Sequence, residues 1–299
     1  MLSNPNITDI LVNGHKEVWI DKGNGLEKTK LTFLNEESVR SLAQRLALST
    51  GRRLDQSQPY VDAQLSKSIR LHAVLSPIAN PGTVISLRIH RPQIMSLSEL
   101  VMNKTITTSQ KDFLYEIIKE KKSFVICGGT GSGKTTLLNS LLSEVNRNQR
   151  ILIIEDSREL NPQHPHVVSL EGRPANIEGM GLITMKDLIK QSLRMRADRL
   201  IIGEVRGAEV IDWLSALNTG HSGSAGTIHA NSIQEVIIRF ESLGLMAGLS
   251  KEVIHSQLRT ALNHVIHIER NSDGKRQVKA IGEFQTDSTG NCFTEELNI

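Results

Sequence analysis

The segment Gly128–Thr135, which reads GGTGSGKT, constrains the fold more than any other part of the chain. It fits the pattern G-x-x-x-x-G-K-[ST] of a phosphate-binding loop, or P-loop. A short, largely apolar run over residues 122–127 precedes it, and leucines recur at helical spacing over residues 137–145 after it. A strand that turns through glycines into a helix points backbone N–H groups and the positive end of the helix dipole at one place. The sequence therefore predicts a polyphosphate site in an α/β fold.

Within this loop, we expect Lys134 to reach the β- and γ-phosphates and the Thr135 hydroxyl to ligate Mg²⁺. ATP and Mg²⁺ are the expected cofactors. A glycine-rich turn that binds nothing is the alternative, but the flanking strand, the lysine and the threonine argue against it. The predicted nucleotide-binding residues are Gly128, Gly129, Thr130, Gly131, Ser132, Gly133, Lys134, Thr135 and Thr136.

The bulk properties are those of an ordinary soluble protein. A chain of 299 residues is long enough for two domains. The formal net charge of +3 neither requires a nucleic acid partner nor excludes an anionic membrane surface. The two cysteines lie far apart in the sequence and suggest no disulfide framework, which fits a reducing cytoplasm. Neither a signal peptide nor an apolar segment of membrane-spanning length is evident, so we expect a cytoplasmic protein.

The chain divides into three parts by pattern. Residues 1–91 read as a small N-terminal α/β domain of short strands and one helix. Residues 92–108 read as a linker with a short helical piece, and they would be the hinge for any domain motion. Residues 109–299 alternate strands with helices, which is typical of a parallel sheet. The fold class expected from these patterns is α/β.

Carboxylates follow two of the predicted buried strands in the C-terminal part. The strand at 151–154 leads into Glu155 and Asp156, and the strand at 200–203 leads into Glu204. In a P-loop sheet, a carboxylate at such a strand end faces the metal and the attacking water. A solvated strand terminus is the alternative for either one alone.

A segment rich in small residues, Gly220–Ser232, contains two histidines. His229 comes just before a capped helix and could place an imidazole N–H near the γ-phosphate. His221 is the weaker candidate. We expect the remaining histidines to be surface or packing residues.

These motifs resemble, in content and order, those of the type II/type IV secretion traffic ATPases. The motifs are the P-loop, the acidic stretch RILIIEDSREL, the stretch RLIIGEVRG and the histidine stretch GHSGSAGTIHANS. Within that superfamily the chain is most similar to the tight-adherence (Tad/Flp) pilus assembly ATPases, through DILVNG, GRRLDQSQPYVDAQL, RPANIEGMG and LRMRADRLIIGEVRGAE. The pair Ala225-Gly226 departs from the family in being small, so we expect that strand to be more loosely packed.

The resemblance implies a RecA-like ATPase core preceded by a PAS-like N-terminal domain. It implies that Glu204 polarises or deprotonates the attacking water, that Glu155 supports the metal and the water, and that His229 senses the γ-phosphate. How the base role divides between the two glutamates stays open. The implied metal-site residues are Thr135, Glu155 and Glu204. Arginines are expected to complete the site, although each could instead form an ordinary surface salt bridge: Arg88 and Arg91 from the N-terminal domain, and Arg194, Arg196 and Arg206 from the core.

The resemblance also implies a homohexameric ring that docks on inner-membrane platform proteins and powers pilus assembly or secretion. No specific nucleic acid partner is expected. A conjugation or effector-secretion ATPase of the type IV system is the alternative, and neighbouring genes would separate the two. A nucleotide-gated scaffold without turnover and a DNA motor are further alternatives, and the low charge and scarce aromatic residues argue against the DNA motor.

Overall fold

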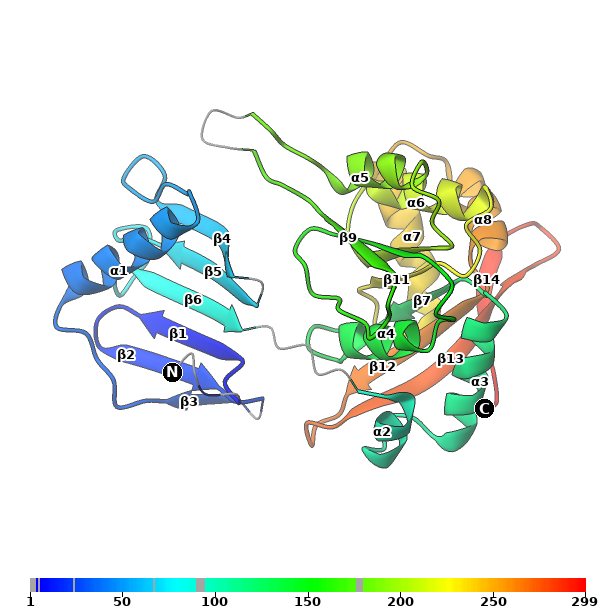
Figure 1. The fold of residues 1–299 in the computed structure, drawn as a ribbon, viewed down its shortest axis with the longest axis horizontal. Coiled ribbons are helices and arrows are strands. Elements are labelled where there is room, and N and C mark those ends of the chain that lie inside the picture. Colours follow the sequence, from blue (N-terminus) through cyan, green and yellow to red (C-terminus); the bar gives the residue numbers. More distant parts are fainter. Residues whose placement is uncertain (1–3, 5, 24, 67, 90–94, 176–179) are drawn as a thin grey trace. The chain divides into compact units, whose positions relative to one another are not determined.

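The computed structural model describes residues 4, 6–23, 25–66, 68–89, 95–175 and 180–299. The chain forms two compact units (Figure 1). Unit 1 comprises Met1–Arg91 with Ala175–Leu182, and unit 2 comprises Pro92–Pro174 with Ile183–Ile299. None of the helices in the described parts of the chain is both long enough and apolar enough to cross a bilayer.

Unit 1 is one antiparallel sheet covered by one helix. The strand order is β3-β2-β1-β6-β5-β4. Alternate strand residues are buried against the inner face of helix α1 (Glu36–Ser49), which Asn35 caps by accepting a hydrogen bond from the Ser38 backbone N–H at 3.0 Å. The strands are β1 (Asp9–Asn13), β2 (Glu17–Asp21), β3 (Leu26–Lys28), β4 (Tyr60–Ser66), β5 (Ile69–Val74) and β6 (Val84–Ile89).

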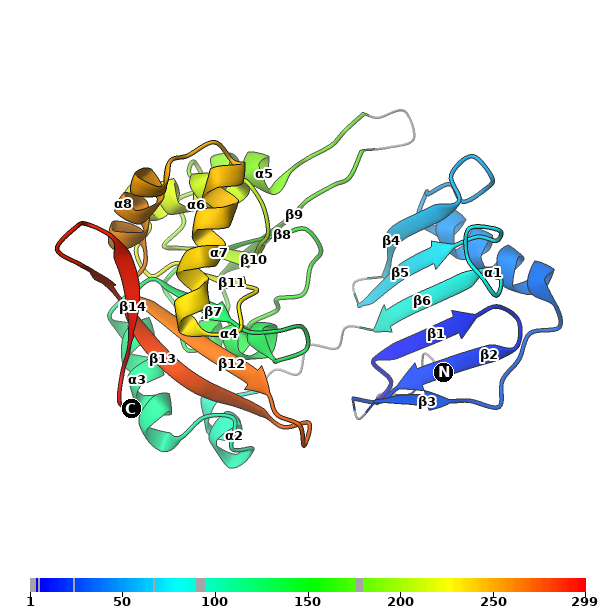
Figure 2. The ribbon, with the colours of Figure 1, turned by 180° about the vertical axis from the view of Figure 1, so that it is seen from behind.

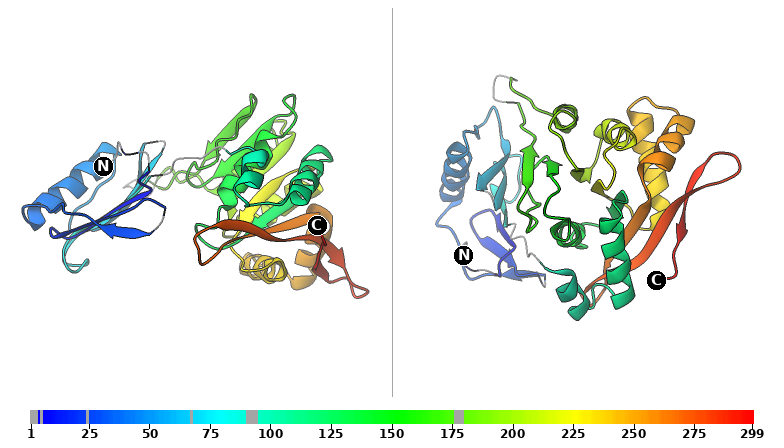
Figure 3. Two further views of the ribbon diagram at one scale, coloured as in Figure 1. Left: turned by 90° about the horizontal axis from the view of Figure 1, so that it is seen from below. Right: turned by 45° about the vertical axis from the view of Figure 1, so that its right-hand side comes forward.

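Unit 2 is built on an eight-stranded sheet of order β14-β13-β12-β7-β11-β10-β8-β9. The run from β12 to β9 is parallel, and β13 and β14 extend one edge in antiparallel fashion (Figure 3). The strands expected at 122–127, 151–154 and 200–203 are present as β7, β8 and β10. The parallel strands are β7 (Phe124–Cys127), β8 (Ile151–Glu155), β9 (Val167–Glu171), β10 (Arg199–Val205), β11 (Ala225–Ile228) and β12 (His264–Arg270); the antiparallel strands are β13 (Arg276–Thr286) and β14 (Cys292–Glu296).

Helices cover both faces of this sheet, because its central strands are apolar on both sides. In β7, Phe124 and Ile126 face one cluster while Val125 and Cys127 face the other. Helices α5 to α8 contribute to the second cluster, and α7 and α8 come to the front in Figure 2. The helices are α2 (Leu97–Met102), α3 (Thr108–Lys119), α4 (Lys134–Ser143), α5 (Met185–Ser192), α6 (Glu209–Asn218), α7 (Ile233–Met246) and α8 (Lys251–Ala261).

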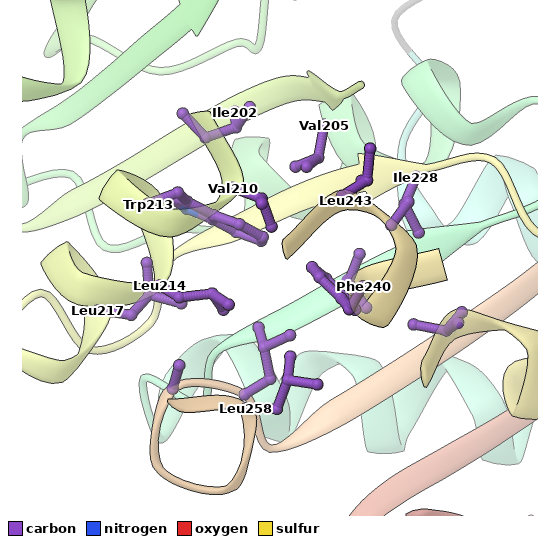
Figure 4. Close-up of a cluster of buried hydrophobic side chains, with 14 of the residues drawn as sticks. Ile202, Val205, Val210, Trp213, Leu214, Leu217, Ile228, Phe240, Leu243 and Leu258 are labelled. Atoms are coloured by element: carbon purple, nitrogen blue, oxygen red, sulfur yellow. The ribbon is translucent and has the colours of Figure 1, made fainter. Parts of the chain in front are cut away.

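Strand β11 is tightly packed, so the expected looseness at Ala225-Gly226 is wrong. The Trp213 side chain of α6 occupies the space that the small residues leave, and it lies among the labelled core residues of Figure 4. A Cβ added at Gly226 would lie 3.0 Å from the Trp213 ring. The small residue therefore accommodates a large neighbour and leaves no gap.

The segment expected to be a linker is partly built into unit 2. Leu97, Leu100 and Ile106 are 2–3% exposed and pack in one cluster with α3 and α4. Burial of these three side chains holds α2 against the core of unit 2. Residues 92–94 of the predicted linker lie outside the described residues.

Candidate functional site

The P-loop joins β7 to α4 through glycines whose backbone other residues rarely adopt. Gly128, Gly131 and Gly133 have φ values of 156°, 71° and 101°. A Cβ added at Gly128 would lie 2.1 Å from the carbonyl oxygen of Ile268, which no packing adjustment accommodates. Glycine at this position is therefore required by the backbone angle and by the neighbouring strand.

Lys134 begins α4 and is turned into the loop. Its ammonium group donates hydrogen bonds to the carbonyl oxygens of Gly128 at 2.8 Å and Gly129 at 2.9 Å. The side chain is 7% exposed, and this burial lowers the pKa of Lys134. The ammonium group that is expected to bind a phosphate thus forms hydrogen bonds to the backbone of the loop in this structure.

The loop fits a polyphosphate. The Ser132 hydroxyl is buried and, among the described residues, makes no hydrogen bond. A buried polar atom without a partner is costly, and a phosphate oxygen would satisfy it. No group of three or more His, Cys, Asp or Glu side chains in the described residues is arranged to hold a metal ion.

Glu204 and His229 come together at the P-loop end of the sheet. Glu204 is the second-last residue of β10 and His229 directly follows β11, the neighbouring parallel strand, and His229 Nε2 lies 2.7 Å from Glu204 Oε1. The other carboxylate oxygen pairs with the Arg206 guanidinium. Burial, followed by the positive charge of Lys134, lowers the pKa of His229. The imidazole is therefore neutral at neutral pH, and its Nε2–H donates to the carboxylate.

Glu155 ends β8 and is almost completely buried, at 5% exposure. Its Oε1 accepts hydrogen bonds from the backbone N–H groups of Glu159 at 3.1 Å and Leu160 at 3.0 Å. Its side chain lies against Gly203, where an added Cβ would be 2.6 Å from Glu155 Cγ. Burial raises the pKa of Glu155 to about 7. The carboxyl group therefore changes protonation near neutral pH.

This pKa makes stability depend on pH. Between 4.5, the ordinary value, and about 7, folded Glu155 keeps a proton that the unfolded chain has released. Unfolding in this window releases a proton, so raising the pH lowers the free energy of unfolding. We expect the melting temperature of the wild-type protein to fall as the pH is raised from 5 to 8, and that of Glu155→Gln to fall less, because glutamine has no proton to release. The same dependence of melting temperature on pH in both proteins would contradict the raised pKa of Glu155.

Glu159 is a candidate that the sequence analysis did not single out. Its Oε2 lies 3.4 Å from the Thr135 hydroxyl, and its backbone N–H is bonded to Glu155. Thr135 thus faces Glu159, whereas the sequence analysis grouped it with Glu155 and Glu204 as metal-site residues. The sequence signal for it was the third acidic residue of the stretch EDSRE, residues 155–159. This residue lies four positions beyond the end of β8.

Within unit 2, Arg194, Arg196 and His221 are not gathered at the P-loop. Arg194 and Arg196 are exposed and precede the first residue of β10, so they lie toward the opposite edge of the parallel sheet. His221 likewise precedes β11, with Nδ1 3.2 Å from the Ala216 carbonyl oxygen. Arg88 lies in unit 1, is 63% exposed and has Nε 3.4 Å from Asp9 Oδ1. Arg91 lies outside the described residues.

A pocket of about 460 Å³ adjoins the start of the P-loop. Gly128, Gly129 and His229 form one part of it, and α7 contributes Glu235 and Arg239. The Arg239 charge is one of those that lower the His229 pKa. The histidine thus lies between the loop and a solvent-accessible space lined by charged side chains.

Comparison with known proteins is consistent with this geometry. The family model described as "Type II/IV secretion system protein" matches residues 1–295. A putative conjugal transfer protein of Mycobacterium tuberculosis (strain ATCC 25618 / H37Rv) is 47% identical over 287 residues, covering 94% of this chain and 82% of that protein. The type IV secretion system protein PtlH of Bordetella pertussis (strain Tohama I) is 31% identical, covering 89% and 85%.

Solved structures show the same fold. The VirB11 ATPase of the Brucella suis type IV secretion system, crystallised with sulphate, superposes with a TM-score of 0.52 at 26% identity and covers 94% of this chain and 93% of its own. The pilus retraction motor PilT with bound ADP gives a TM-score of 0.63 at 19% identity, covering 97% and 78%. The predicted α/β fold with a RecA-like core is confirmed. The relatives named here are conjugal transfer and type IV secretion proteins, and the tight-adherence subfamily is not confirmed.

Proposed function

Because the chain belongs to the type II/IV secretion system protein family, we propose that it is an ATPase that powers transport through a type IV secretion or conjugation system. The observation that carries the proposal is that Lys134, Glu204 and His229 lie together at the carboxyl ends of the parallel strands. Relatives at 47% and 31% identity are named for conjugal transfer and type IV secretion. Their names support this system over the pilus system that the sequence motifs favoured.

In the proposed reaction, ATP with Mg²⁺ supplies the γ-phosphoryl group and the charge that polarises it. Lys134 and the N–H groups of the loop bind the phosphates. Glu204 accepts a proton from the attacking water, since a carboxylate at this strand end is placed for general-base work. The neutral His229 donates to Glu204 and so orients it. Glu155 and Glu159 hold the loop that faces Thr135.

Assembly and location belong to the same proposal. We infer a cytoplasmic homohexamer attached to inner-membrane proteins of the transport system. Arg88 and Arg91 stay candidates for completing the site from unit 1, and Arg194 and Arg196 stay candidates for a neighbouring copy. Arg206 already contacts Glu204 within the chain.

Pilus assembly of the tight-adherence type is the second candidate function. The observation that favours it is the stretch RPANIEGMG, residues 173–181, together with LRMRADRLIIGEVRGAE, residues 193–209. Genes for pilins and platform proteins beside this one would favour that system, whereas genes for a conjugation channel would favour the first.

Loss of Lys134 tests the ATPase proposal directly. We expect Lys134→Ala to lower Mg²⁺-dependent ATP hydrolysis by about 10²–10³-fold, the range observed when one preorganised donor to transition-state charge is removed. Phosphate release by the purified chain is the measurement. Lys119→Ala is the matched control, because the Lys119 side chain is 65% exposed and, within the described parts of the chain, pairs only with Glu116 on its own helix. Equal hydrolysis by Lys134→Ala and the wild-type protein would reject the proposal.

A further inference from the structure

The hairpin between β12 and β13 forms one wall of the P-loop. The Ile268 carbonyl of β12 lies against Gly128, where an added Cβ would be 2.1 Å away. The Arg276 side chain of β13 lies against Gly133, where an added Cβ would be 3.0 Å from Arg276 Cδ. Two of the loop glycines are thus packed on a segment more than a hundred residues later in the sequence.

Arg276 also bonds to the loop. Its Nε–H donates to the Gly131 carbonyl oxygen at 3.3 Å. A guanidinium carries five N–H groups, and this is the one hydrogen bond that the Arg276 side chain makes among the described residues. Its remaining donors therefore lie beside a loop that is shaped for phosphates.

A second arginine stands directly across the hairpin. Arg270 is the cross-strand partner of Arg276 in the β12–β13 ladder. Burial first, and then the charge of Arg270, lower the pKa of Arg276. Like charges directly opposite each other in a sheet destabilise it. The hairpin therefore carries two positive side chains at this position, and Arg276 brings its charge to the P-loop, where an anion is expected.

We propose that Arg276 is a nucleotide-binding residue, which steadies Gly131 and, with Arg270 beside it, adds positive charge at the phosphates of the bound nucleotide. This inference rests on the proposed ATPase function. It assigns a role to a residue outside all four motifs. It also gives a role to the hairpin, in which β12 pairs in parallel with β7 and β13 returns antiparallel along β12.

The test measures binding of ADP and of inorganic pyrophosphate by calorimetry. We expect Arg276→Met, which keeps the alkyl packing on Gly133, to weaken binding of both ligands about tenfold, the size of one lost charge-assisted hydrogen bond. Arg276→Lys, which keeps the charge, should be intermediate. Lys279→Met is the control, because Lys279 lies on the same strand and its ammonium bonds to Gln277 at 3.1 Å.

The effect should shrink as salt is raised, because a contact between exposed charges is screened. A purely structural role would weaken binding equally at all salt concentrations and would overturn the inference. Wild-type affinity in Arg276→Met would overturn it as well, as would weaker ADP binding with unchanged pyrophosphate binding. If the wild-type chain binds neither ligand, the proposed function itself fails. Melting temperatures within about 2 °C of wild type would confirm that each variant is folded.

Discussion

Glu204→Gln should lower ATP hydrolysis by about 10²–10⁴-fold, the typical contribution of a general base, and should leave nucleotide binding intact. Glutamine is nearly isosteric with glutamate but cannot accept the proton of the attacking water. Glu204 Oε1 is 2.7 Å from His229 Nε2, and the amide oxygen of glutamine can still accept that hydrogen bond. The variant should therefore keep the strand arrangement while losing the chemistry.

Single-turnover hydrolysis and ADP affinity, measured on the same preparation, separate these two effects. Glu116→Gln is the matched control, because the Glu116 side chain is 50% exposed on α3 and its one ion pair among the residues that the structure describes is with Lys119. Turnover close to wild type in Glu204→Gln would move the base role to Glu155 or Glu159. Loss of ADP binding would instead show that Glu204 is needed for the nucleotide-binding site to form.

Arg199→Met should lower the free energy of unfolding by about 1–3 kcal/mol, the range for leaving a buried polar group without its hydrogen-bond partner. Arg199 is 1% exposed at the start of β10. Its guanidinium donates to Gln149 Oε1 at 2.8 Å, to the Gly223 carbonyl at 3.1 Å and to the Ile118 carbonyl at 2.5 Å. Methionine would fill much of the volume but remove these three hydrogen bonds, although the Ile118 carbonyl would still accept from the Lys121 backbone N–H at 3.3 Å.

The charge on Arg199 is also retained at neutral pH. Burial lowers its pKa to about 10, which is still well above 7. Urea unfolding followed by circular dichroism would measure the loss, with Arg147→Met as the control at an exposed position. A domain is stable by only about 5–15 kcal/mol, so the expected loss is a large share. A change below about 0.5 kcal/mol would contradict the assigned role.

The sequence was most informative for features that follow from the strand pattern alone. Strand ends of a parallel sheet share an edge, so Glu204 and His229 could be predicted to meet. The apolar runs likewise located the parallel strands, because strands buried on both faces are continuously hydrophobic.

Residues whose position depends on non-local pairing could not be found in this way. Arg276 lies at the P-loop because β12 pairs with β7 and β13 folds back along β12, and no periodicity in the sequence encodes that order. Arg199 looks like an ordinary polar strand terminus, yet three separate segments close over it. Glu159 returns to Thr135 through a turn that strand patterns do not describe.

The contact between Gly128 and the Ile268 carbonyl bears on how an alignment of this family should be interpreted. An unchanging glycine in a P-loop is usually attributed to selection by the ligand. Here the first glycine of the motif is already demanded by the strand beside it, before any nucleotide arrives. A descendant that had lost all catalysis would still have to retain it in order to fold.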